Sequence, residues 1–496
     1  MSTLLSKSDY LLFLKHPAWV WLKKHNIKKL PPVDDNLQAI FDAGHLFEAY
    51  AEGLFPDTIK LGFGSYEEYL SLPTRTKSEL KSGTKIISQG RFEAEGITCI
   101  CDIVVSAGED TLDLYEIKSS TKAKPEHEED LAFQMIVLEE SGYKVRNIFV
   151  IHVNNKYIRD GKIDPKQISD VRDITKKVKE KRQDTKAGIK KAVEVVSSPK
   201  IPDISPSLAK DTDALKEWLP IYRNLTDVEP YSIYDLFYAK ENTIGKLEKL
   251  KIQKLEDIPD DFPLNDKQKF QVLTTRTNKE IIKKSEIKSF LSKLVFPLYF
   301  LDYETLASVI PYFDGLSPYQ QIPFQYSLHI LNAPEGKLRR VTYLHKENSN
   351  PAGELSKSLQ ENIDKKGSIL VWNESFEKSC NKSLGALVPE FASFYEDVNE
   401  RIIDLMIPFS KGWYVHKDFG GSASIKNVLP VLVPKLSYKE LDVQEGKAAQ
   451  RVWMETVLEG KRESEKTKIL NDLDEYCKLD TLAMVEIYKR LLKLND

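Results

Sequence analysis

Long apolar runs are missing from this chain of 496 residues. No stretch of 18 consecutive apolar residues occurs, and the first residues lack the basic-then-apolar pattern of a secretory signal. We therefore expect neither a membrane span nor secretion. Hydrophobic residues still make up 41% of the chain, which supports globular folding throughout. Because single cores stop growing near about 250 to 300 residues, the length predicts two or three cores.

Cysteine is scarce as well. The chain has four, Cys99, Cys101, Cys380 and Cys477, and neither a C-x-x-C pair nor paired His/Cys spacing occurs. We therefore expect no iron–sulfur cluster and no zinc site, and we interpret the four cysteines as small buried apolar side chains. Cysteines without a disulfide pattern suit a reducing compartment, so we expect a cytoplasmic protein.

Excess charge of one sign is small. The formal net charge of −3 argues against a protein that coats nucleic acid with its whole surface. Basic charge is local instead, and it gathers between positions 176 and 191 at Lys176, Lys177, Lys179, Lys181, Arg182, Lys186, Lys190 and Lys191. Two interpretations stay open. The stretch is either a solvated helix or linker, or a strip that contacts phosphates and gives salt-dependent binding.

Two acids, Asp302 and Glu304, close the apolar run of residues 294–301. Side chains at i and i+2 of a strand point to the same face, so these carboxylates converge. Two like charges held that close each make ionisation of the other harder, unless a cation lies between them. The alternative is that the pair only marks the polar end of a strand. The acids that follow downstream favour a divalent-metal site.

Those acids come from two later segments. Glu377 lies one turn into a helix that is predicted after a second apolar strand. Tyr476 and Asp480 are four residues apart and share one face of a predicted amphipathic helix. With Asp302 and Glu304 they make four acids and a phenol from three segments. A two-metal phosphodiesterase, with Mg²⁺ or Mn²⁺, can use such a set.

Residues 291–496 resemble the DnaQ-like 3′–5′ exonucleases of the RNase H-like superfamily, whose motifs follow the order D-x-E, N-x-x-F-D and Y-x-x-x-D. Asp302 and Glu304 match the first motif, Tyr476 and Asp480 match the third, and Glu377 stands where the second has Asp. The resemblance implies that the four acids hold two metal ions and that the tyrosine orients the attacking water.

The front of the chain carries a second, independent set. Residues 90–105 and 111–118 are predicted to be two strands of a hairpin, which brings Asp102 near Glu116. Glu116 and Lys118 share one face by the same i, i+2 rule. Carboxylates of this kind bind a metal ion, and the ammonium can position water and screen charge on phosphate. An ordinary exposed hairpin is the alternative.

Helices are predicted on both sides of this hairpin. The upstream helix presents His45 and Glu48 three residues apart on one face. The downstream helix opens at residues 130–134 and carries Gln134. We take His45 and Gln134 as candidate nucleic-acid contacts.

The order of a helical Glu, a strand Asp, a strand E-x-K and a helical Gln resembles the RecB-like branch of the PD-(D/E)xK nucleases, including the CRISPR-associated RecB-like exonucleases. Leu138 stands where the Q-x-x-x-Y motif of that branch has Tyr. The resemblance implies that Lys118 assists the attacking water while three acids hold the metal ion. These acids are Glu48, Asp102 and Glu116.

Four longer sequence strings in the second half of the chain point to one family that contains both domains. Residues 310–312, 318–329, 401–405 and 421–426 resemble the recurrent wording of an uncharacterised bacterial family, a domain of unknown function, in which a RecB-like nuclease domain precedes a DnaQ-like one. In the last string Lys426 follows a Gly/Ser turn, where it contacts either phosphate or only water.

The expected fold class is α/β. It has a PD-(D/E)xK restriction-endonuclease-like domain over 1–172, a mainly helical connector over 173–290, and an RNase H-like (DnaQ-like) domain over 291–496. The expected function is metal-dependent hydrolysis of nucleic-acid phosphodiesters, with DNA favoured over RNA, in DNA repair or mobile-element defence and with protein partners of such a complex. A catalytically degenerate nucleic-acid-binding or assembly module is the alternative, because a fold does not guarantee chemistry.

Overall fold

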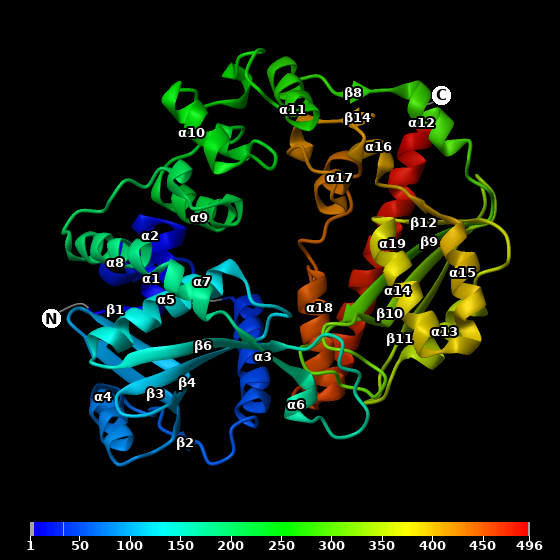
Figure 1. The fold of residues 1–496 in the computed structure, drawn as a ribbon. Coiled ribbons are helices and arrows are strands. Elements are labelled where there is room, and N and C mark those ends of the chain that lie inside the picture. Colours follow the sequence, from blue (N-terminus) through cyan, green and yellow to red (C-terminus); the bar gives the residue numbers. More distant parts are fainter. Residues whose placement is uncertain (1–3, 33, 495–496) are drawn as a thin grey trace. The chain divides into compact units, whose positions relative to one another are not determined.

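The computed structural model describes residues 4–32 and 34–494, which divide into two compact units (Figure 1). Unit 1 comprises Met1–Glu229 and Tyr238–Lys251, and unit 2 comprises Pro230–Phe237 and Ile252–Asp496. Each unit contains a sheet and helices, so the predicted α/β class is confirmed at this level. The helices of residues 173–290 are shared between the two units.

The sheet of unit 1 has the strand order β2-β3-β4-β5-β6-β7, and β1 pairs with β4. The strands are β1 (Leu5–Ser6), β2 (Ile59–Lys60), β3 (Ile86–Ala94), β4 (Ile97–Ser106), β5 (Thr111–Lys118), β6 (Lys144–Val153) and β7 (Ser169–Asp173). The prediction of one continuous strand over 90–105 was wrong, because the chain turns between β3 and β4 at Gly96. This glycine has a φ of +76°, a left-handed conformation that glycine adopts without steric penalty.

The helices of unit 1 are α1 (Lys7–Lys15), α2 (Pro17–His25), α3 (Asp35–Glu52), α4 (Tyr66–Lys81), α5 (Pro125–Glu140), α6 (Pro165–Ile168), α7 (Thr175–Glu180), α8 (Arg182–Ser197), α9 (Thr212–Leu225) and α10 (Glu241–Lys249). Of these helices, α1, α3, α4, α5, α6 and α7 contact the sheet, and the others pack on further helices and turns. The central helix is α5, which contacts β3, β4 and β6 as well as α1, α7 and α8. With neighbours on both sides, it buries polar side chains along with apolar ones, including Asp130 and Gln134.

The sheet of unit 2 has the strand order β11-β10-β9-β12-β13. Its strands are β9 (Leu298–Leu306), β10 (Ile322–Leu331), β11 (Leu338–Leu344), β12 (Ser368–Val371) and β13 (Ile402–Asp404), and β8 (Ile281–Ile282) pairs separately with β14 (Tyr414–Val415). The central strand β9 runs antiparallel to β10 and parallel to β12. The ladder with β12 covers only Leu298–Phe300 of β9, so the acid-bearing end of β9 extends past it.

Two groups of helices cover the two faces of this sheet (Figure 1). The helices of unit 2 are α11 (Asp266–Thr277), α12 (Lys284–Leu291), α13 (Ala352–Gln360), α14 (Glu374–Leu387), α15 (Ala392–Glu400), α16 (Ile407–Ser410), α17 (Ile425–Leu432), α18 (Gly446–Trp453) and α19 (Lys466–Lys493). Helix α19 crosses β9, β10 and β11, while α14 packs on the opposite face, where Tyr303 donates to Asn381 at 2.8 Å. Because neighbours alternate along a strand, Asp302 and Glu304 point the other way, toward α19.

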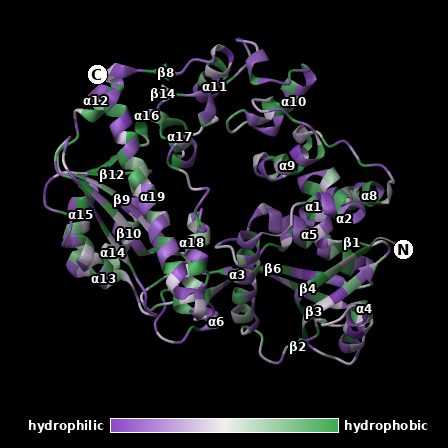
Figure 2. Cartoon of the chain, turned by 180° about the vertical axis from the view of Figure 1, so that it is seen from behind, coloured by the Kyte–Doolittle hydropathy of each residue, from purple (hydrophilic) through white to green (hydrophobic). Residues whose placement is uncertain are grey.

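Apolar residues concentrate along the strands, and polar residues follow the outer turns of the helices (Figure 2). Each unit accordingly has its own buried core, built on β9, β10 and α19 in unit 2 and on β4, β6 and α5 in unit 1. Within the described part of the chain, none of the helices combines the length and apolar character that a membrane crossing requires.

Candidate functional site

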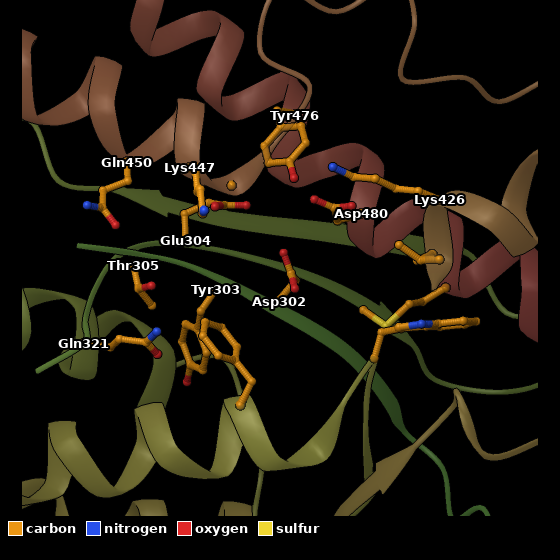
Figure 3. Close-up of a pocket in the computed structure, with 15 residues that line it drawn as sticks. Asp302, Tyr303, Glu304, Thr305, Gln321, Lys426, Lys447, Gln450, Tyr476 and Asp480 are labelled. Carbon is orange, nitrogen blue, oxygen red and sulfur yellow. The ribbon is translucent and has the colours of Figure 1, made fainter. Parts of the chain in front are cut away.

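The two strand acids and the helix acid of unit 2 meet in one cavity of about 430 Å³. Figure 3 shows the carboxyl groups of Asp302, Glu304 and Asp480 directed toward one another, with the hydroxyl of Tyr476 beside them. The strand β9 supplies the first two acids at i and i+2, and α19 supplies the tyrosine and Asp480 at i and i+4. With Lys426, the structure therefore brings five of the six candidate residues of 291–496 around one cavity, and Glu377 is the sixth.

Charge repulsion in this cavity is strong. Burial raises the pKa of Asp302 well above its usual value, and the charges of Asp480, Glu304 and Glu377 raise it further. Burial and the charge of Asp480 likewise raise the pKa of Glu304. Burial raises the pKa of Asp480 to about 6, although hydrogen bonds from Tyr438 and Tyr476 and the charge of Lys426 oppose the rise. The carboxyl groups thus repel one another and lack solvent to screen them.

Lys426 is a cation at the rim of this acid group. Its ammonium lies 5.7 Å from the ring centre of Tyr438 and 5.9 Å from that of Tyr476, and it donates to the carbonyl of Gln444 at 2.7 Å. The same charge lowers the pKa of Glu304. Lys426 therefore faces the cavity that the acids line, where sequence analysis placed a candidate phosphate contact.

Glu377 is buried beside the cavity, with 1% of its surface exposed. Burial raises its pKa to about 8, and among the described residues its Oε2 atom has no hydrogen-bond partner. The start of α14 fixes its position. Asn373 precedes this helix in a left-handed conformation with a φ of +91°, and Asp404 accepts from the backbone N–H groups of Asn373 at 3.1 Å and Glu374 at 3.3 Å.

Two further groups at this site were not anticipated as functional. The Tyr438 hydroxyl donates to Asp480 Oδ1 at 2.6 Å, although the irregular segment around it has no periodicity to indicate this. The Sγ atom of Cys477 lies within 4.8 Å of carboxylate oxygens of Asp302 and Glu304. Burial raises the pKa of this thiol well above its usual value, and the neighbouring acids raise it further, so the sulfur stays protonated.

The predicted acids of unit 1 also come together, one strand apart. The β4–β5 ladder sets Ile103 opposite Tyr115, and the Asp102 carboxylate accepts from the backbone N–H of Ile117 at 2.8 Å. Burial raises the pKa of Asp102 to about 7, and the charge of Glu116 adds to the rise. The hairpin thus places Asp102 near Glu116, as the sequence predicts.

Glu116 is the centre of a dense network. Its Oε1 atom accepts from Lys7 at 2.8 Å and from Lys118 at 2.7 Å, and its Oε2 atom accepts from Gln134 at 2.7 Å. Asp130 accepts from Lys118 at 2.8 Å and from Gln134 at 2.9 Å. Gln134, predicted as a nucleic-acid contact, is fully buried and instead supports the two carboxylates. Sequence analysis did not single out Lys7 or Asp130.

The ammonium groups of this network are held in their charged form. Burial alone lowers the pKa of Lys7, but the charges of Glu116, Asp130 and Asp102 raise it well above its usual value. The pKa of Lys118 is raised by the same acids against the effect of burial. Lys118 and Asp130 also line an open cavity of about 840 Å³ in unit 1.

Glu48 approaches the same cluster from α3. Its carboxylate accepts from Gln89 at 2.6 Å, and Gln89 has a left-handed conformation with a φ of +55° within β3. Burial raises the pKa of Glu48, and the charges of Glu52 and Glu116 add to the rise. His45 lies one turn away on α3, is exposed, and lowers that pKa.

The basic stretch after β7 borders a separate cavity of about 440 Å³, lined by Lys122, Ala123, His152, Arg172, Asp173, Ile174, Lys176 and Lys177. His152 on β6 is the register partner of Lys118 on β5, so this cavity lies one strand away from the acid cluster of unit 1 around Glu116. Lys177 is paired with Glu128 at 3.1 Å, and Lys179 donates to the carbonyl of Arg146 at 2.9 Å. The Lys176 side chain is 91% exposed.

The comparisons with known proteins identify relatives but no activity. Residues 299–424 match the model of a family described as "Domain of unknown function (DUF2779)". This range includes Asp302, Glu304 and Glu377, whereas Lys426, Tyr476 and Asp480 lie beyond it.

Three curated relatives are similar to the chain at low identity. The chain is 25% identical over 237 residues to "Uncharacterized protein MG366" of Mycoplasma genitalium, a match that covers 43% of this chain and 35% of the relative. It is 26% identical over 220 residues to the homologue of that protein in Mycoplasma pneumoniae, covering 41% and 33%. It is 26% identical over 317 residues to "Uncharacterized protein UU173" of Ureaplasma parvum, covering 58% and 43%. The matches thus span less than half the length of each relative.

Proposed function

We propose that this protein is a metal-dependent nuclease that hydrolyses nucleic-acid phosphodiesters, with one site in each unit. The observation that carries the proposal is the convergence of Asp302, Glu304 and Asp480 in one cavity. Buried carboxyl groups that face one another in a cavity repel, and a bound cation relieves this repulsion. DNA is the favoured substrate, and a cytoplasmic role in DNA repair or mobile-element defence, with partners in such a complex, belongs to the same proposal.

The architecture of unit 2 supports a DnaQ-like, RNase H-like assignment for its site. The first motif lies on the central strand β9, the second opens α14 on one face of the sheet, and the third lies on α19 across the other face. In unit 1, a helical Glu48, strand residues Asp102, Glu116 and Lys118, and a helical Gln134 support the RecB-like, PD-(D/E)xK assignment in the same way.

The residues of the unit 2 site fit a divalent metal ion. Asp302, Glu304 and Asp480 line the cavity together with Lys426 and Lys447, and the buried Oε2 atom of Glu377 has no hydrogen-bond partner among the described residues. Carboxylate oxygens are the ligands that Mg²⁺ and Mn²⁺ prefer. When bound, such ions would lower the pKa of water and offset the charge that develops on phosphate. Asp302, Glu304, Glu377 and Asp480 are the residues that would hold them.

The other side chains of the cavity have separate tasks. The Tyr476 hydroxyl, beside Asp480, can hold a water molecule by a hydrogen bond and so set its direction of attack. The Lys426 ammonium can pair with a phosphate oxygen. Trp372 and Phe376 also line the cavity, and aromatic rings provide stacking surfaces for unpaired bases. This combination suits the 3′ end of a strand.

A degradation assay tests the proposal. End-labelled single- and double-stranded DNA and RNA are incubated with Mn²⁺ and wild type, with Asp302→Ala/Asp480→Ala, or with Asp102→Ala/Lys118→Ala. We expect the first double variant to lose 3′-end trimming and to keep any cleavage by unit 1, and the second to do the reverse. Glu475→Gln removes an exposed acid of the same helix α19 and serves as the control. Identical trimming by wild type and the first double variant refutes the assignment.

The alternative for unit 1 is a nucleic-acid-binding module without catalysis. It is favoured by the network around Glu116, whose two oxygens accept from Lys7, Lys118 and Gln134 within the protein itself. A carboxylate satisfied in this way has less to gain from a metal ion. Calorimetric titration with Mn²⁺ separates the alternatives, because a degenerate unit 1 adds no binding event to that of unit 2.

A further inference from the structure

Lys7 is the first residue of α1, and its ammonium reaches into the acid cluster of unit 1. It donates to Glu116 Oε1 at 2.8 Å, the same oxygen that accepts from Lys118 at 2.7 Å. The Lys7 side chain is 25% exposed and that of Glu116 is 2% exposed. One oxygen of the buried Glu116 carboxylate thus accepts from two ammonium groups. The resemblance to PD-(D/E)xK nucleases implies that the same carboxylate binds a metal ion.

The backbone on both sides fixes the position of Lys7. Strand β1 pairs in parallel with β4, and the backbone N–H of Leu5 donates to the carbonyl of Gly96 at 2.9 Å. Ser6 caps α1 by accepting from the backbone N–H of Asp9 at 3.2 Å, and Asp9 in turn accepts from the N–H of Ser6 at 3.0 Å. The ammonium therefore starts from an anchored backbone, and only its own side chain has to move for it to leave Glu116.

The two acid clusters differ in how the neighbouring lysines contact the acids. In unit 1, Lys7 and Lys118 face the acids Asp102, Glu116 and Asp130. In unit 2, Lys426 and Lys447 line the cavity, and the Lys426 ammonium donates to the carbonyl of Gln444 at 2.7 Å instead of to a clustered acid. A cation that approaches Glu116 meets two positive charges already in place, and repulsion inside a protein is screened less than in water.

We propose that Lys7 is an internal cation that competes with a divalent metal ion for Glu116, so that metal enters the unit 1 cluster only when this ammonium gives up its oxygen. The inference rests on the proposed function in one respect, that the ligand of the cluster is a divalent metal ion. It adds a regulatory consequence. Unit 2 fills with metal first, and unit 1 stays empty until the metal concentration is higher or an anion draws Lys7 away.

Calorimetric titration with Mn²⁺ tests the inference on the full chain. The background is Asp302→Asn/Asp480→Asn, which removes ligands of the unit 2 site and leaves the heat of unit 1. In that background we expect Lys7→Met and Lys7→Gln to bind Mn²⁺ at least tenfold more tightly than the parent, and Lys7→Arg to bind like the parent. Adding Glu116→Gln to Lys7→Gln should abolish the gain, because it removes the contested ligand.

The matched control is Lys15→Met, which removes a cation at the other end of the same helix, where Lys15 pairs with Glu217 at 2.5 Å. If the Lys7 variants bind Mn²⁺ within twofold of the Lys15 control, or do not bind it at all, the inference is wrong. Lys7→Gln guards against a folding defect, since its amide can still donate to Glu116, and thermal unfolding checks each variant. Nuclease assays on the same proteins judge the proposed function separately: tighter binding without cleavage refutes catalysis and leaves the competition standing.

Discussion

Replacing Asp480 with Asn is expected to stabilise unit 2 in the absence of divalent cations. Burial raises the pKa of this carboxyl from 3.8 to about 6 in the folded protein. An acid whose folded pKa lies above its unfolded pKa favours folding while it is protonated, and that contribution is lost as the pH rises through the folded value. The penalty is therefore absent near pH 4 and complete above about pH 6, where it amounts to about 3 kcal/mol.

Asparagine removes the charge but keeps an oxygen that can accept from the Tyr438 hydroxyl. Most of the penalty should then be recovered. For a unit of roughly 250 residues, about 3 kcal/mol corresponds to a rise in Tm of about 6 to 12 °C. Thermal unfolding in EDTA should give nearly equal Tm values for wild type and Asp480→Asn near pH 4, and a higher Tm for the variant at pH 8.

Mn²⁺ should reverse this order. A ligand at a concentration of about 1,000 times its Kd stabilises the folded state by about 4.1 kcal/mol, which exceeds the penalty of about 3 kcal/mol, and wild type has the full set of acids to bind it. Glu475→Gln, on the exposed side of α19, should behave like wild type in both conditions. If Asp480→Asn at pH 8 in EDTA melts at or below the temperature of wild type, burial does not raise the pKa of Asp480 as described.

The remaining predictions concern three other positions. Glu377→Gln should weaken Mn²⁺ binding by roughly tenfold or more and should raise the free energy of unfolding at pH 7 in EDTA by about 3 kcal/mol, because folding raises the pKa of this carboxyl from 4.5 to about 8 and wild type must take up a proton that Gln does not need; calorimetry and thermal unfolding measure the two effects. Tyr438→Phe should shift the acidic limb of the pH–rate profile to higher pH, because the hydrogen bond from Tyr438 lowers the pKa of Asp480 and its loss raises that pKa. Arg172→Gln with Lys176→Gln should reduce the slope of log K against log salt by about 1.4 to 1.8 in oligonucleotide binding.

Each of these has a clear contrary result. Unchanged Mn²⁺ affinity in Glu377→Gln means that its buried oxygen does not reach the metal. An unmoved pH profile in Tyr438→Phe assigns the tyrosine a packing role. For the salt dependence, Lys249→Gln at the exposed end of α10 is the control, and an equal change in slope there removes any special role for the basic cavity.

Local spacing was sufficient to find the acids that one element presents together. Asp302 and Glu304 follow the period of a strand, and Tyr476 and Asp480 follow the period of a helix, so each pair is readable without a three-dimensional model. The α/β class followed from the two family resemblances, together with the strands and helices predicted around the acids. The prediction missed the turn at Gly96 because apolar residues alternate along the sequence on both sides of this glycine, in β3 and in β4.

Partners from distant segments could not be read in this manner. Lys7 reaches Glu116 across 109 positions because β1 pairs with β4, and nothing near Lys7 indicates that pairing. Tyr438 meets Asp480 from an irregular segment that has no period at all. Asp130 lies in the second turn of α5, and its contact with Lys118 of β5 depends on how this helix packs on the sheet. These contacts depend on tertiary packing and not on local pattern.

The position of Asp480 within α19 ties the unit 2 site to the most protected part of that unit. The helix spans Lys466–Lys493, and its buried residues extend from Ile469 to Leu491, on either side of the acid. Its amides around Asp480 should consequently exchange with solvent only through global opening of the unit, whereas those at its two ends exchange by fraying. Loss of the acid constellation and loss of the fold are then a single event, so under the proposed function the Mn²⁺ bound by unit 2 would count the intact molecules in a preparation.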